Sequence, residues 1–167
     1  MPRTLHLVLV ALAVGVGATV SIDLWNLALQ RFLGVASLNY RLLGRWIGHM
    51  PRGVFRHRSI AAARATAFEH VLGWLAHYAI GVGLALAFTL WLAPGWLMQP
   101  TFAPALVYGV GTVVFPFFVM QPSLGLGVAS AATPHPMRAR VKSVLTHSVY
   151  GAGLYASARV AAYVISR

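Results

Sequence analysis

The apolar stretches of this sequence contain few side chains that could do acid–base or ligand chemistry. Asp23 lies well inside the first stretch, and a carboxylate at such a depth costs about 2.5–3.5 kcal/mol on insertion scales. We therefore expect Asp23 to face the protein interior and to have a partner. His77 is the first choice and His147 the second, because helical spacing puts both at a compatible depth. The other members of this expected polar cluster are Tyr150, His70 and Asn26.

Four interpretations of this cluster stay open. An Asp–His chain could relay protons or bind an ion, since histidine titrates near neutral pH. Asp23, His77 and His147 could hold a divalent metal, although no HxxH or HExxH signature supports it. A His–Asp pair could act as a general base, but no adjacent nucleophile stands out. Interhelical hydrogen bonding is the structural alternative. The sequence itself requires no cofactor.

The composition indicates which elements must position these residues. Hydrophobic residues make up 59% of the 167 residues and charged residues only 9%, against about 25% charged residues in a soluble domain. This balance predicts an integral membrane protein. The formal net charge of +11 does not point to nucleic acid, because a nucleic-acid module needs a soluble scaffold. Cysteine is absent, which excludes disulfides and thiolate metal sites.

Four apolar stretches, at about 5–33, 68–92, 102–120 and 144–165, each reach the roughly 20 residues that cross a bilayer as a helix. We expect an all-α fold, a four-helix bundle that forms a single transmembrane domain over 1–167. The first stretch exceeds the apolar core of a signal peptide, which favours an uncleaved helix.

Basic residues orient this bundle. Ten of the 13 lysines and arginines lie in the segment 31–64 and in the connection before the fourth stretch, whereas the connection "APGWLMQP" has none. The positive-inside rule makes the basic connections cytoplasmic. In a bacterial inner membrane, both termini of this multi-pass protein are then periplasmic.

The segment 38–59, "LNYRLLGRWIGHMPRGVFRHRS", concentrates this charge. Its apolar residues recur at helical spacing opposite Arg41 and Arg45, which predicts an amphipathic helix at the membrane interface over about 38–50, capped by Ser37. We expect the arginines to contact the headgroups of an anionic bilayer; the alternative is a specific anionic ligand. The expected lipid-contacting residues are Arg41, Arg45, Arg52, Arg56 and Arg58.

Two local patterns concern packing. Thr66 and Glu69 in "TAFE" have the spacing of a capping box at a helix start. Small residues four apart let helices approach closely. Residues four apart form one series, Gly73, His77, Gly81 and Ala85, and a second, Ser148, Ala152 and Ala156.

Four motifs in order, "GATVSIDLWNL", "SLNYRLLGRWIGHMPRG", "LGWLAHYAIGV" and "VFPFFVMQPSLGLGVA", together resemble a bacterial family of small four-span inner-membrane proteins of unknown function. The resemblance covers nearly the whole chain and implies a membrane bundle, without an activity or a ligand. We expect a non-enzymatic accessory, binding or small transport component, alone, as a homo-oligomer or in a larger membrane complex. The alternative is a metal- or histidine-dependent membrane-embedded enzyme.

Overall fold

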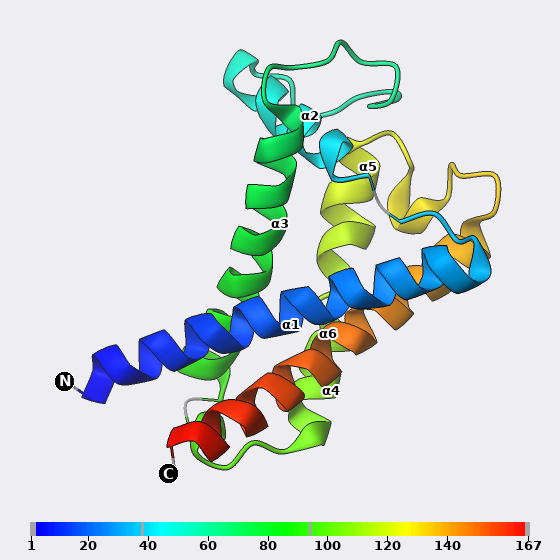
Figure 1. Ribbon diagram of the computed structural model, residues 1–167. Helices are drawn as coiled ribbons and strands as arrows, with labels where there is room; N and C mark the ends of the chain where they lie inside the picture. Colours follow the sequence, from blue (N-terminus) through cyan, green and yellow to red (C-terminus); the bar gives the residue numbers. More distant parts are fainter. Residues whose placement is uncertain (1–2, 38, 94, 166–167) are drawn as a thin grey trace. The chain divides into compact units, whose positions relative to one another are not determined.

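The computed structural model describes residues 3–37, 39–93 and 95–165; Leu38, where the amphipathic helix was expected to begin, lies outside them. The described residues form helices and no strand, which confirms the all-α class. In chain order these are α1 (Arg3–Leu33), α2 (Tyr40–His49), α3 (Glu69–Leu86), α4 (Phe102–Gly111), α5 (Gln121–Ser123) and α6 (Pro136–Ile165) (Figure 1). Wide π-helical turns occupy Ala87–Leu92 and Pro116–Met120, and short 3-10 turns occupy Met50–Arg52, Trp96–Met98 and Val128–Ser130.

Three helical segments in the described residues are long and apolar enough to cross a membrane: Thr4–Leu33, Glu69–Leu92 and Phe102–Ser123. They match the first three predicted stretches closely. The fourth stretch is helical within α6, which begins earlier, at Pro136. This helix carries Arg138, Arg140, Lys142 and Arg159 and is not among the three. Its role as a membrane span stays a prediction.

The contacts divide the chain into two compact units. Unit 1 contains Met1–Ala36, Tyr78–Thr112 and Leu145–Arg167, and unit 2 contains Ser37–His77 and Val113–Val144. The helix α3 therefore contributes its first turns to unit 2 and the remainder to unit 1. The prediction of a single domain stays a prediction.

Unit 1 is held together by small side chains. Its buried core consists of Ala11, Val14, Ala18, Ala85, Phe88, Trp96, Leu97, Ala105, Tyr150, Leu154 and Ala158. Helices α4 and α6 approach closely at Gly109 and Gly151, where a Cβ on Gly151 would lie 2.6 Å from the carbonyl oxygen of Ala105. Gly153 of α6 faces Ala18 of α1, and Figure 1 shows these two helices side by side in this region. Small residues at these positions let the helix backbones approach closely.

The expected small-residue stripes are only partly used for this packing. Gly81 faces Thr19 of α1, as a packing role requires. On α6, Gly151 and Gly153 are in close contact with neighbouring helices, and Ala156, the last member of the expected series, is exposed.

Unit 2 packs α2 across the first turns of α3. Gly44 of α2 and Gly73 of α3 face each other, and a Cβ on Gly73 would meet the carbonyl group of Tyr40. The cap of α2 is Asn39, whose side chain accepts from the Arg41 N–H at 3.0 Å, so the prediction that Ser37 caps this helix was wrong. Asn39 is better placed because it immediately precedes the first helical residue.

The connection between α2 and α3 is tied to the segment that follows α5. The N–H of His57 donates to the carbonyl of Ser123 at 2.9 Å, and that of Ile60 donates to Leu124 at 3.1 Å. Ile60 and Leu124 are both buried. This long connection is therefore an ordered part of unit 2.

Candidate functional site

Asp23 of α1 has a partner that the sequence did not suggest. The hydroxyl of Tyr78 donates to its Oδ2 at 2.8 Å, and the Asp23 side chain is half-buried. A hydrogen bond from the phenol lowers the free-energy cost of placing a carboxylate among apolar side chains. Tyr78 directly follows His77 in the sequence, so it was the neighbour of the expected partner. The pairing of Asp23 with His77 stays a prediction.

The other expected residues of unit 1 hold helices together. The Thr112 hydroxyl donates to the carbonyl of Gly109 at 2.6 Å and lies 2.7 Å from Nδ1 of His147. Since the only hydroxyl proton points to Gly109, we assign the proton of the second bond to Nδ1. The buried Tyr150 hydroxyl donates to the carbonyl of Gly81 at 2.6 Å, joining α6 to α3. Both contacts fix the register of neighbouring helices.

The remaining members of the expected cluster have different surroundings. Asn26 is buried in α1. His77 stacks on Tyr40, with 4.1 Å between ring centroids, and His70 is exposed near Trp74. Within the described ranges, no group of three or more histidine, aspartate or glutamate side chains is placed to hold a metal ion. Asp23, His77 and His147 therefore do not form the metal site that one interpretation allowed.

The strongest polar centre of unit 2 is the pair of Arg45 and Glu69. Arg45 donates Nε–H to Oε2 at 2.8 Å and an Nη2–H to Oε1 at 3.1 Å, a two-point geometry that fixes both side chains. Its Nη1 lies 3.1–3.3 Å from the carbonyl oxygens of residues 60, 61 and 63. Exposed fractions are 14% for the arginine side chain and 5% for the glutamate. Hydrogen bonding to Glu69 raises the pKa of Arg45, so this guanidinium stays charged.

Glu69 also forms half of the expected capping box. Its Oε2 accepts from the backbone N–H of Thr66 at 3.3 Å. The reciprocal bond is missing, because the buried Thr66 hydroxyl has no hydrogen-bond partner. The chain turns between them at Phe68, whose φ of 58° is unusual for a bulky residue. The T-x-x-E spacing therefore predicted the bond from the Thr66 N–H to Glu69, but the complete capping box does not form.

This arrangement changes the meaning of the arginine cluster. Arg45 was expected to contact lipid headgroups, but its donors are directed to Glu69 and to backbone carbonyls inside unit 2. Arg41 lies 3.3 Å from Glu69 with a side chain 59% exposed. Arg52, Arg56 and Arg58 are exposed.

A cavity of about 350 Å³ opens beside these arginines. Its wall is formed by His49, Arg52, Arg64, Ala65, Thr66 and Ala67. The Nε2 of His49 lies 2.9 Å from the carbonyl of Arg64, and Nη1 of Arg52 donates to the carbonyl of Gly48 at 3.4 Å. The first bond joins the end of α2 to the chain entering α3, and the second orients Arg52 at the end of α2.

A second histidine, His57, contacts His49. The ring centroids of His49 and His57 are 5.0 Å apart in an edge-to-face arrangement. Burial, and then the nearby charge of His49, lower the pKa of His57. Its Nε2 is buried without a hydrogen-bond partner. Helical spacing predicts His49 on the polar face with Arg41 and Arg45, whereas nothing in the sequence indicates that His57 lies beside it.

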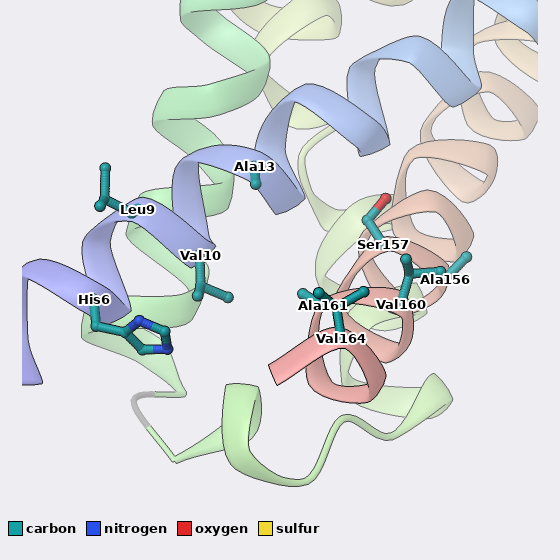
Figure 2. Close-up of a pocket in the computed structure, with 9 residues that line it drawn as sticks. All are labelled: His6, Leu9, Val10, Ala13, Ala156, Ser157, Val160, Ala161 and Val164. Atoms are coloured by element: carbon teal, nitrogen blue, oxygen red, sulfur yellow. The ribbon is translucent and has the colours of Figure 1, made fainter. Parts of the chain in front are cut away.

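Unit 1 has a larger, apolar groove of about 600 Å³ between α1 and α6. Figure 2 shows Leu9, Val10 and Ala13 on one side and Val160 and Val164 on the other. His6 and Ser157 are its polar members. This lining suits hydrocarbon and offers no constellation for chemistry.

Comparison with protein families places the chain. Residues 12–161 match the family described as Protein of unknown function (DUF2938). The chain belongs to this family. The matched residues include the Asp23–Tyr78 contact, the Arg45–Glu69 pair and the whole cationic cavity, whereas His6 and Val164 of the apolar groove lie outside them. Comparison with curated proteins and with solved structures finds no match. The membership confirms the resemblance to a family of unknown function and assigns no activity.

Proposed function

We propose that this protein is a multi-pass protein of the bacterial inner membrane, and that unit 2 binds anionic lipid headgroups on the cytoplasmic side. The supporting observation is charge: unit 2 contains nine of the 13 basic residues and one acid, Glu69, which is paired internally. Anionic headgroups attract such a surface by about 1 kcal/mol for each nearby arginine or lysine. The positive-inside rule then puts both termini in the periplasm.

The arginines divide into two roles under this proposal. Arg45 fastens α2 to α3 and does not meet lipid. The exposed side chains of Arg41, Arg52, Arg56 and Arg58 contact headgroup phosphates, and α2 lies near the membrane interface as an amphipathic helix. A fastened scaffold keeps the remaining guanidinium groups in one region, which raises their combined attraction.

A non-enzymatic binding, accessory or small transport role fits this protein best. Tyr150, Thr112 and His147 are used in contacts between helices, so these groups have a structural task. A homo-oligomer or a larger membrane complex is compatible with the many exposed apolar side chains of the spans, because lipid and partner helices cover such surfaces alike.

Lipid retention tests the proposal. Detergent-purified full chain is mixed with equimolar phosphatidylglycerol and phosphatidylcholine, and retained lipid is counted by native mass spectrometry. We expect enrichment of the anionic lipid, which decreases at about 0.5 M salt because the Debye length shortens. Replacing the four exposed arginines by glutamine should remove the enrichment. Equal retention of both lipids by the unmodified chain would contradict the proposal.

A further inference from the structure

The cationic cavity of unit 2 combines three features that together point to a ligand. Arg52 and Arg64 both line it, together with His49, so two guanidinium groups and an imidazole belong to the residues around it. In the described part of the chain, neither arginine has a carboxylate partner: Glu69 is taken by Arg41 and Arg45, and Asp23 accepts from Tyr78. The sequence has no further aspartate or glutamate. The cavity thus has positive charge that no acidic side chain of the chain neutralises.

Hydrogen-bond donors remain available there as well. Arg52 uses one of its five N–H groups on Gly48, which orients the guanidinium at the end of α2 and leaves the others for a ligand. Thr66 also lines the cavity, but its hydroxyl is buried against Gly48, so the arginine N–H groups are the donors that a ligand can reach. Planar guanidinium groups match phosphate oxygens in two-point geometry.

From this geometry we infer that the cavity lined by His49, Arg52, Arg64 and Thr66 binds a phosphate group, with a doubly charged phosphomonoester as the best match. Two arginines balance two negative charges, whereas a phosphodiester brings only one. A volume of about 350 Å³ is at the small end of ligand pockets, which suits the phosphate and the first atoms of its ester. The inference rests on the proposed headgroup-binding role of unit 2 and names one specific site within it.

The phosphate can come from a lipid headgroup or from a soluble ester, and two arms of one experiment distinguish these sources. In the first, the full chain in neutral detergent is titrated calorimetrically with inorganic phosphate and with glycerol 3-phosphate. In the second, it is titrated with mixed micelles that contain phosphatidic acid, a phosphomonoester lipid, or phosphatidylglycerol, a phosphodiester lipid. All titrations use about 150 mM salt to screen distant charges.

The variants are matched in charge. R52Q/R64Q removes both guanidinium groups from the cavity, and R56Q/R58Q removes two exposed arginines that do not line it. We expect saturable binding that R52Q/R64Q weakens by about tenfold or more, and R56Q/R58Q by less than about twofold, since losing charge-assisted hydrogen bonds costs more than losing a distant charge.

Each outcome decides the inference. This variant pattern with the soluble probes supports a soluble ester, and the same pattern with phosphatidic acid alone supports a lipid headgroup. If both double variants weaken binding equally, attraction is diffuse and the cavity is not the site, while the headgroup proposal stands. Absence of binding to every phosphomonoester probe overturns the inference. The lipid-retention experiment with phosphatidylglycerol reports independently on the broader proposal.

Discussion

The ion pair of Arg45 and Glu69 gives the sharpest prediction for unit 2. Arg45→Met removes five hydrogen bonds: two to the carboxylate and three to the carbonyls of residues 60, 61 and 63. It leaves a carboxylate only 5% exposed, with Arg41 as its remaining cation at 3.3 Å. Removing one partner of a buried pair costs about 3–5 kcal/mol, because the other charge is left uncompensated.

The matched control is Arg41→Met. Arg41 approaches the same carboxylate, but its side chain is 59% exposed, and exposed ion pairs contribute about 0–1 kcal/mol. A third variant, Arg45→Met with Glu69→Met, removes both charges together. It should lose less stability than Arg45→Met alone, since no charge remains buried without a partner.

Two measurements compare the stability of these variants. Thermal unfolding in detergent, monitored by circular dichroism, gives the order of stabilities. Limited trypsin digestion reports on the connection between α2 and α3, where Arg52, Arg56, Arg58 and Arg64 are exposed cleavage sites. Arg45→Met should accelerate cleavage there, because the chain at 60–63 loses its anchor. If Arg45→Met and Arg41→Met melt and digest alike, the pair does not fasten unit 2 and the reasoning fails.

Three further predictions concern the pH response, the buried carboxylate and the orientation. Burial lowers the pKa of His57 in the folded state, so the unfolded state binds the proton more readily. The contribution of neutral His57 to folding stability should therefore be complete above about pH 6.5 and should decrease as the pH falls below it. In His57→Gln, the melting temperature should depend less on pH over this range. Tyr78→Phe should lower resistance to unfolding by sodium dodecyl sulfate by about 0.6–1.7 kcal/mol, the range of such bonds in membranes, and adding Asp23→Asn should recover part of the loss; strict additivity of the two changes would argue against their coupling. Single cysteines at Arg56 and Gln99, in a chain without native cysteine, should react oppositely with a membrane-impermeant thiol reagent in intact cells, and labelling at 56 alone would reverse the orientation.

The sequence alone determined the helices, and the reason is local. An apolar stretch of about 20 residues must satisfy its backbone hydrogen bonds within itself in hydrocarbon, so 68–92 and 102–120 were predicted close to the observed Glu69–Leu92 and Phe102–Ser123. The contact of Glu69 with the N–H of Thr66 was predictable for the same reason, since it depends on a spacing of three residues.

Only the tertiary structure decided which side chains meet. The arginines of 38–59 look alike in the sequence, and the close approach of α2 to α3 at Gly44 and Gly73 selects Arg45 for Glu69. Tyr78 meets Asp23 because neighbouring residues on a helix point in directions about 100° apart, so a packing angle chooses between Tyr78 and His77 and composition does not. The cationic cavity depends in the same way on the turn from α2 into α3, which brings Arg64 beside His49. Local hydrogen bonding is encoded by residue type and spacing, whereas these contacts are decided by how closely the helices can approach.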